Sequence, residues 1–193
     1  MKFSDNIILK NDTVLLRPLK VEDYESFLEI AFDPEIWKYN VTSASNEYEL
    51  QKWIDDALES KKNNLRYPFT ITDIKSERIF GSTSIGNISL TDKRAEIGWT
   101  WLGSEFQGTG INKHCKFLLL QYLFDQLQFE RVEFKTDVIN LKSRKALQKI
   151  GAKEEGVLRS HTLMHDGRRR DTIYYSILKG EWPSIKKIFS ILS

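Results

Sequence analysis

Two glycines stand in a short stretch of this chain that is well suited to bind an anion. The stretch lies between an expected strand, residues 94–102, and an apolar helix expected from about Thr109 to Gln128, and it reads Gln107, Gly108, Thr109, Gly110, Ile111, Asn112. The first N–H groups of a helix have no partner inside the helix, and the peptide dipoles add about half a positive charge there. Glycine carries no Cβ, so a phosphate can approach the backbone closely. These residues predict a site for a phosphate-bearing ligand.

Two common phosphate-binding motifs do not fit this stretch. A P-loop needs a lysine directly after its second glycine, and Thr109 follows Gly108 instead. A dinucleotide-binding fingerprint needs a third glycine, and Lys113 stands at that position. Glycine pairs are also common in ordinary turns, so the stretch by itself leaves a turn without a ligand as an equal alternative.

The composition of the chain bounds its class. With 193 residues, 40% of them hydrophobic, the chain is expected to fold as one domain with a sizeable core, and a disordered chain is excluded. A net charge of +2 is too small to imply nucleic acid as a partner. No apolar run approaches about 18 residues and the start lacks a signal-peptide core, so neither a membrane partner nor export is expected.

The cysteine and histidine content argues against a disulfide or a metal site. Cys115 is the only cysteine, which excludes an internal disulfide and favours a reducing, cytoplasmic location. Three scattered histidines and one cysteine do not have the spacing of metal ligands. Nothing near Cys115 marks it as a nucleophile, so an inert buried thiol is expected.

Hydrophobic periodicity and turn residues predict the elements of the first half of the chain. The expected strands are residues 7–10, 13–19, 67–74, 79–90 and 94–102. The expected helices are residues 21–32 and 45–62. The first helix should bury one face, formed by Tyr24, Phe27, Leu28 and Phe32.

The second half alternates helices and strands. The helix after the glycine turn is apolar around nearly its whole circumference, so it should be buried against a sheet. The elements after it are a strand over 131–138, a helix over 140–150, and a hairpin of strands 153–164 and 168–178. A strand, a long helix and another strand form a βαβ crossover, so the two strands that flank the helix should be parallel. The expected fold is α/β with a mixed sheet, antiparallel in its first half.

Five blocks of the sequence occur in the order of one protein family. They are residues 15–19 (LLRPL), 96–99 (EIGW), 107–112 (QGTGIN), 140–143 (NLKS) and 151–156 (GAKEEG). Together they resemble the GNAT superfamily of acyl-CoA-dependent N-acyltransferases, and within it the RimJ/RimL branch. The superfamily signature is Gln or Arg, two residues, Gly, one residue, and Gly or Ala. Gln107 and Gly110 match it, whereas Asn112 departs from it because a small apolar residue is usual there.

The resemblance implies a single GNAT domain over residues 1–193, with six to seven strands in a mixed, splayed sheet and helices on both faces. It implies acetyl-CoA as cosubstrate and no metal. The diphosphate would lie on the backbone of the glycine turn, and the pantetheine arm would hydrogen-bond along Thr100, Trp101 and Leu102. A bulge in that strand would aim a backbone N–H at the thioester oxygen, and Gly98 favours such a bulge.

Glu96 is the expected general base for an amine acceptor, because superfamily members often use a carboxylate on this strand. Strand alternation puts Glu96 on the same face as Gly98 and Thr100, beside the pantetheine arm. An N-terminal amine has a pKa of about 7.7–8.0 and a lysine amine of about 10.4, so a modest base suffices only for the former. The alternative is that Glu96 forms an ion pair with Arg94 or Lys93.

Asn140 and Ser143 are further candidate catalytic and cofactor-binding residues. In the RimJ/RimL branch the asparagine holds the pantetheine arm or a water, and the serine donates a hydrogen bond to the departing sulfur. In the sequence alone, helix capping is the commoner use of such a pair, and the two uses are compatible. Lys145 and its neighbour Lys142 are candidate contacts of the CoA 3′-phosphate, with a solvated helix face as the alternative.

Other candidates carry weaker signals. Trp37 and Tyr39 are candidates to line the acceptor pocket, as their loop does in relatives, and the favoured alternative is a place in the core. Tyr174 and Tyr175 are candidate general acids, ranked after the serine. Residues 168–170 (RRR) are expected on a solvated hairpin, or else draw in an acidic acceptor.

The expected function is acetyl transfer from acetyl-CoA to a primary amine by direct attack in a ternary complex. The acceptor is a protein N-terminus or a small-molecule amine, and a homodimer is an open option because dimers are frequent among relatives. The alternative is a non-catalytic GNAT-fold module that binds acyl-CoA as a regulator or interaction protein. The presence of Glu96, Asn140 and Ser143 argues against that alternative. A basic nucleic-acid binder ranks third, because the net charge is nearly zero.

Overall fold

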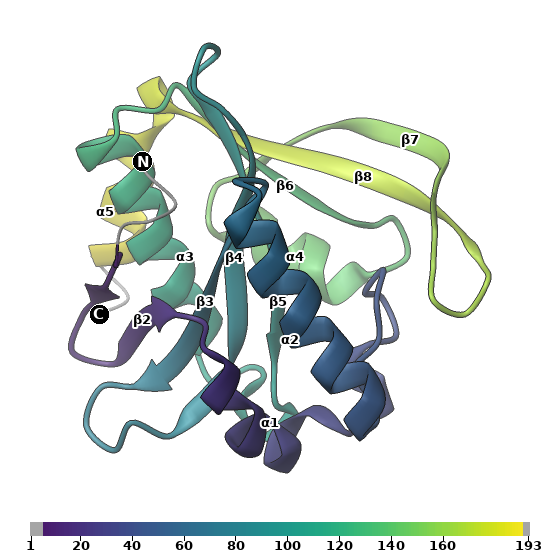
Figure 1. The fold of residues 1–193 in the computed structure, drawn as a ribbon. Helices are drawn as coiled ribbons and strands as arrows, with labels where there is room; N and C mark the ends of the chain where they lie inside the picture. Colours follow the sequence, from purple (N-terminus) through teal and green to yellow (C-terminus); the bar gives the residue numbers. More distant parts are fainter. Residues whose placement is uncertain (1–5, 191–193) are drawn as a thin grey trace.

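A computed structural model describes residues 6–190 of the chain as one mixed sheet with helices on both faces (Figure 1). The strands lie in the order β1-β2-β3-β4-β5-β6-β8-β7. Neighbours are antiparallel except β5 and β6, which are parallel as the crossover predicts. The sheet has eight strands where six to seven were expected, and the shortest of them is the two-residue β1.

The observed elements follow the expected ones closely. The strands are β1 (Leu9–Lys10), β2 (Val14–Pro18), β3 (Arg66–Asp73), β4 (Ile79–Ser89), β5 (Arg94–Leu102), β6 (Arg131–Asp137), β7 (Lys153–Leu163) and β8 (Arg169–Leu178). The α-helices are α1 (Tyr24–Ala31), α2 (Glu47–Lys62), α3 (Ile111–Gln121), α4 (Leu141–Lys149) and α5 (Trp182–Ser190). The shorter helical turns are η1 (Val21–Asp23), η2 (Pro34–Ile36), η3 (Ser104–Phe106), η4 (Tyr122–Gln126) and η5 (Lys179–Glu181).

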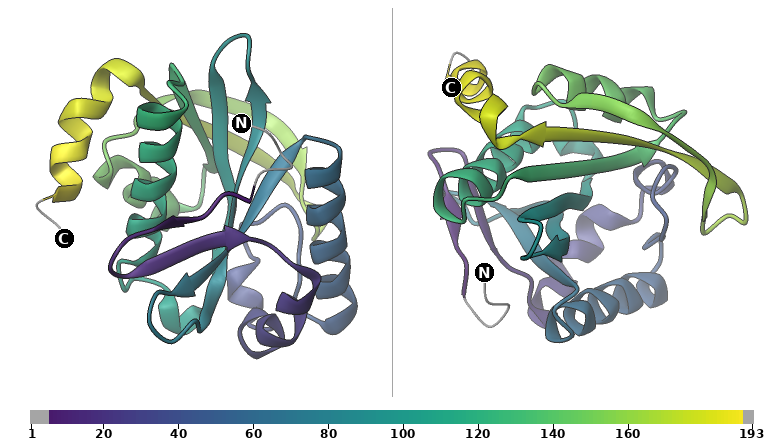
Figure 2. Two further views of the ribbon diagram at one scale, coloured as in Figure 1. Left: turned by 60° about the vertical axis from the view of Figure 1, so that its left-hand side comes forward. Right: turned by 90° about the horizontal axis from the view of Figure 1, so that it is seen from above.

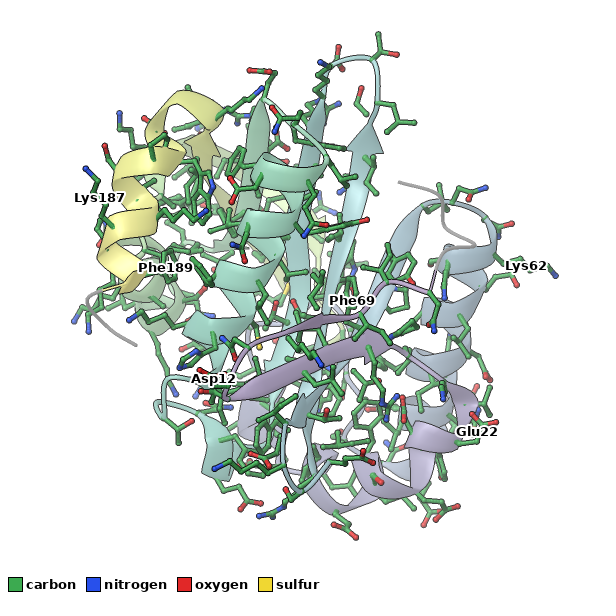
Figure 3. The ribbon with its side chains drawn as sticks, turned by 90° about the vertical axis from the view of Figure 1, so that its left-hand side faces the viewer. Asp12, Glu22, Lys62, Phe69, Lys187 and Phe189 are labelled. Atoms are coloured by element: carbon green, nitrogen blue, oxygen red, sulfur yellow. The ribbon has the colours of Figure 1, made fainter. Side chains whose placement is uncertain are left out.

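Helices cover the two faces of the sheet unequally. Helices α1 and α2 lie on one face, and α3, α4 and α5 lie on the other (Figure 2). Helix α5 was not expected from the sequence, and it extends the layer that contains α3. The ring of Phe189 points from α5 toward α3 (Figure 3), where its centroid is 5.3 Å from that of Phe117.

Two expected helices differ in detail. Helix α1 ends at Ala31, and its buried residues are Phe27, Ile30 and Ala31, so the expectation that Phe32 belongs to the buried face is wrong: its side chain is 37% exposed. The long helix begins at Ile111 and changes at Tyr122 to the π-helical turn η4. No helix within residues 6–190 has the length and apolarity needed to cross a bilayer.

Candidate active site

The glycine turn before α3 is shaped to receive an anion. Gly108 and Gly110 have φ angles of 81° and 95°, and a Cβ at either position would have no atom within 4 Å. Gly110 is the N-cap of α3, and its carbonyl accepts the N–H of Lys113 at 2.9 Å. The N–H groups of Ile111 and Asn112 stand in the first turn of α3, where a helix offers no internal acceptor, and this arrangement fits a diphosphate.

Side chains around this turn connect it to β5 and α4. Gln107 donates from Nε2 to the Leu102 carbonyl at 3.2 Å, and its Oε1 accepts a hydrogen bond from Lys142 at 2.7 Å. Lys142 of α4 therefore reaches the turn, and the expected contact of Lys145 with the 3′-phosphate of CoA stays a prediction. Asn112 buries its Oδ1 without a hydrogen-bond partner within the described chain.

Beside the turn, β5 and β6 separate. They pair only from Arg94 to Glu96 on β5, opposite residues 131–133 on β6, although β5 continues to Leu102 and β6 to Asp137. Past Glu96, the edge of β5 that faces β6 has no strand partner within residues 6–190. An extended ligand can hydrogen-bond to such an edge. We call the opening between β5 and β6 beyond Glu96 the fork. Its free β5 edge fits a pantetheine arm along Thr100–Leu102.

The edge of the fork carries a β-bulge at Trp99. Gly98 pairs with Ser84 and Trp101 with Ser82, so two residues of β5 oppose one residue of β4. Trp99 itself has a φ of 50°, a left-handed conformation that costs a bulky residue free energy and is often found at functional sites. The expected bulge is present, but the irregular residue is Trp99 and not Gly98.

The bulge reverses the alternation of β5 side chains. Thr100 hydrogen-bonds to Lys116 of α3 at 2.8 Å. The Trp101 ring packs instead against Trp53 of α2, with centroids 5.7 Å apart. Gly98 lies before the bulge, and a Cβ there would be 3.0 Å from the Glu96 carboxylate. The expectation that Glu96 and Thr100 share a face is therefore wrong: Glu96 lies on the α1–α2 face and Thr100 on the α3 face.

Glu96 is buried, 6% exposed, and held by two partners. Its Oε2 accepts from Asn87 Nδ2 at 2.7 Å and lies 2.7 Å from Lys135 Nζ on β6. Burial lowers the pKa of Lys135, but the hydrogen bond and charge of Glu96 outweigh burial, so the net shift is upward. Glu96 therefore forms an ion pair, as the alternative expected, but its partner is Lys135. Arg94 contacts Asp92 and Glu133 instead.

The start of α4 shows the expected cap. Asn140 is the N-cap, and its Oδ1 accepts the backbone N–H of Ser143 at 3.0 Å. Because Lys142 in the same turn contacts Gln107, this end of α4 lies beside the glycine turn. The capping role of Asn140 is therefore confirmed, and contacts of Asn140 and Ser143 with the cofactor stay predictions.

The aromatic loop residues separate into core and surface. Trp37 is 2% exposed, its ring centroid lies 5.1 Å from that of Trp101, and its Nε1 donates to the Ala31 carbonyl. Its side chain therefore belongs to the core, the favoured alternative, rather than to the surface of an acceptor pocket. Tyr39 is half-buried and stays a candidate.

Two of the three arginines over residues 168–170, at the β7–β8 turn, make contact with the interior of the protein. Arg168 donates to the fully buried Asp137 of β6 at 2.5 Å while its own side chain is 36% exposed, and Arg170 is only 8% exposed, so the expected solvated hairpin is wrong for Arg170. Tyr174 lies on the Glu96 side, with the Lys135 amine 5.0 Å from its ring. Tyr175 is fully buried and bonded to Glu154 at 2.9 Å.

Two buried cations at the fork were not recognised in the sequence. Lys116 is 6% exposed, and burial lowers its pKa to about 8. Arg66 is 7% exposed and lies between the rings of Trp53 and Trp99, 5.2 Å from each, and its buried Nη2 has no hydrogen-bond partner among the described residues. A lysine within the apolar stretch of α3 was the available signal for the first. Nothing local marked Arg66.

Gly86 and Cys115 show how the site is packed. A Cβ at Gly86 would come within 2.6 Å of the Trp99 ring, so glycine makes room for that ring. Burial raises the pKa of Cys115 to about 12, which agrees with an inert thiol.

Residues 6–190 contain no cluster of three or more His, Cys, Asp or Glu side chains placed to hold a metal ion.

Sequence comparison identifies the family. Residues 13–153 match the family described as "Acetyltransferase (GNAT) domain". The chain belongs to the GNAT acetyltransferase family. It is 39% identical over 106 residues to the putative ribosomal N-acetyltransferase YdaF of Bacillus subtilis (strain 168), a match that covers 55% of this chain and 57% of YdaF.

Solved structures agree with the GNAT assignment. A putative acetyltransferase from T. thermophilus is 32% identical, with a TM-score of 0.88 and coverage of 98% of this chain and 99% of that one. Mycobacterium smegmatis RimJ, solved in complex with CoA-disulfide, shares the fold at 22% identity, with a TM-score of 0.80 and coverage of 97% and 93%. The family match shows that the protein is an acetyl-CoA-dependent N-acetyltransferase, and the shared fold of RimJ agrees with the expected RimJ/RimL branch.

Proposed function

We propose that this protein transfers the acetyl group of acetyl-CoA to a primary amine, by direct attack of the amine in a ternary complex in the cytoplasm. The observation that carries this proposal is the alignment of three features along one path: the open glycine turn, the fork between β5 and β6, and the bulge at Trp99. A diphosphate, an extended arm and a thioester occur in that order in acetyl-CoA. The residues present therefore fit this cosubstrate.

Each part of the path has a separate task. The backbone N–H groups at Ile111 and Asn112 hold the diphosphate, and the free edge of β5 orients the arm. Bound acetyl-CoA supplies the thioester whose acetyl group is transferred. A backbone N–H released from the ladder at the bulge donates to the carbonyl oxygen, where negative charge develops.

The acceptor amine approaches from the α1–α2 face, where Glu96 lies. Lys135 and Asn87 hold the Glu96 carboxylate in a fixed position. A carboxylate of this kind takes the proton that the amine loses, directly or through a water. It suits an N-terminal amine, whose pKa of about 7.7–8.0 leaves a large neutral fraction near neutral pH.

The acceptor is a protein N-terminus or a small amine, and the first is supported by the similarity to YdaF, named as a putative ribosomal N-acetyltransferase. A screen of acetyl-CoA consumption tests this directly, with peptides that have free N-termini, polyamines and amino acids as acceptors. Free peptides should be turned over, and the same peptides with blocked N-termini should not. Binding of acetyl-CoA without turnover of any amine would favour the non-catalytic module instead.

A further inference from the structure

The amine of Lys116 lies between the two strands of the fork. Its Nζ donates to the Thr100 hydroxyl of β5 at 2.8 Å and lies 5.9 Å from the Phe134 ring of β6. Thr100 follows the bulge residue directly, and its hydroxyl also lies 3.3 Å from the Gly98 carbonyl. The amine is therefore placed where the strands have separated, on the α3 side of the proposed thioester site.

A lysine so deeply buried needs a reason, because an unpaired charge in the interior is costly. The two ionisable groups that act on Lys116 are its neighbour Cys115, a thiol kept neutral by burial, and Glu96. The Glu96 carboxylate lies on the other face of the sheet, held by Lys135 and Asn87. Lys116 thus has a hydroxyl partner and no carboxylate partner within residues 6–190.

We propose that Lys116 is a catalytic residue that hydrogen-bonds to the sulfur of coenzyme A and protonates it as the acetyl group leaves. The inference rests on the proposed function, because it requires the thioester to lie in the fork. A cation at this point stabilises the negative charge that develops on the sulfur.

The step balances with the groups already named. The nitrogen of the acceptor amine forms a bond to the carbonyl carbon of the acetyl group. The carbon–sulfur bond breaks, and its electron pair stays on sulfur. The Lys116 ammonium gives its proton to that sulfur and becomes a neutral amine. The proton lost by the acceptor goes to Glu96 and then to water, and Lys116 recovers a proton from water when CoA departs.

The proton affinity of Lys116 suits this role. Burial lowers its pKa to about 8, close to the value of about 8.5 for an ordinary thiol. Proton transfer between groups of similar pKa is efficient near neutral pH. A serine hydroxyl such as that of Ser143 can donate a hydrogen bond to sulfur but carries no charge.

The ionisation of bound CoA tests the proposal without turnover. The thiolate of CoA absorbs ultraviolet light that the thiol does not, so its pKa can be measured in the complex. The pKa of the bound thiol should be at least about one unit lower in the wild type than in Lys116→Met, because a neighbouring cation favours the charged form. Lys113→Met is the matched control, since Lys113 lies on the same helix with its amine 5.8 Å from the Phe189 ring.

Three results decide between the inference and the function on which it rests. A higher thiol pKa in Lys116→Met, with that of Lys113→Met at the wild-type value, supports Lys116. Equal thiol pKa values in wild type and Lys116→Met, with CoA bound to both, overturn the role of Lys116 and leave the proposed function intact. Failure of the wild type to bind CoA overturns both. Lys116→Arg, which keeps the cation, should retain the lowered thiol pKa.

Discussion

Lys116 and Arg66 are buried cations on opposite faces of the strand fork, and neither forms an ion pair with a carboxylate in the part of the chain that the structure describes. Burial lowers the pKa of both, to about 8 and about 10. Buried charges without partners lower the stability of a fold, so they are retained where they serve a ligand or hold a strained segment. Arg66 has the second role, because it stacks on the left-handed Trp99.

The Lys116 cation should make stability depend on pH. Its pKa falls from 10.5 to about 8 on folding, which corresponds to roughly 3 kcal/mol. Between these pH values the unfolded chain binds the proton that the folded chain has released, so raising the pH stabilises the fold. Compared with Lys116→Met, the wild type should gain up to roughly 3 kcal/mol of unfolding free energy between pH 8 and pH 10.5, measured by urea unfolding. If the unfolding free energies of the wild type and Lys116→Met differed by the same amount at every pH in this range, Lys116 would not be buried as a cation.

Glu96 is expected to carry the base function. Glu96→Gln should lower kcat/KM for a free N-terminal peptide about 10²- to 10³-fold, with the largest loss at low pH, where the amine is protonated. The control is Glu133→Gln, because Glu133 is the register partner of Glu96 on β6 and is also ion-paired. A wild-type pH–rate profile in Glu96→Gln would remove Glu96 as the base.

At the scale of elements, the glycine turn and the fork depend on different physics. The turn needs two left-handed residues without side chains, and glycine is the residue that adopts this conformation at little cost. The fork needs two parallel strands that stop pairing after three residues, which results from the bulge at Trp99 and the packing of α3 beneath it.

Gly110→Ala separates backbone strain from ligand binding. Nothing lies within 4 Å of the added Cβ, so the variant should fold with a loss of about 1 kcal/mol from its φ of 95°. Its affinity for CoA, measured by calorimetry, should fall at least about tenfold because the methyl group stands where a phosphate oxygen would lie.

Gly167→Ala is the matched control for this variant. Gly167 has a φ of 83° and equally open surroundings, in the β7–β8 turn away from the fork. It should lose similar stability and keep wild-type CoA affinity. Equal CoA affinity in the two variants would place the diphosphate elsewhere.

The elements could be predicted from the sequence because periodicity and turn residues are local signals. The strand β5 was located to the residue, and the cap Asn140 was recognised by its type and position. The bulge at Trp99 was not located, because tryptophan has no preference for a left-handed conformation. Contacts with Arg66 on β3 and space at Gly86 on β4 impose it. The face assigned to Thr100 was wrong for the same reason, since one bulge reverses the alternation after it.

Partners contributed by distant strands could not be predicted either. Lys135 reaches Glu96 only because the crossover places β6 beside β5, whereas Arg94 was the neighbour visible in the sequence. A core position for Trp37 was the favoured alternative, but its neighbours in that core, Trp53 and Trp101, come from distant elements and could not be named. The family resemblance supplied the cofactor, and the geometry shows which side chains surround the fork where we propose that it binds.

At the scale of the whole molecule, ligand binding and folding are linked. A ligand that binds only the folded chain stabilises it by RT ln(1 + [L]/Kd), so acetyl-CoA at about a hundred times its Kd should add about 2.7 kcal/mol. The midpoint of thermal unfolding should rise with acetyl-CoA, and dephospho-CoA should also stabilise the fold because it retains the diphosphate. No shift at millimolar acetyl-CoA would contradict the cofactor assignment.

A crystal structure of the protein with CoA tests the central claim most directly. The diphosphate should accept hydrogen bonds from the backbone N–H groups between Gly108 and Asn112, and the pantetheine arm should run along the free edge of β5 toward Trp99. Electron density for the diphosphate at any other helix end or surface would contradict the account.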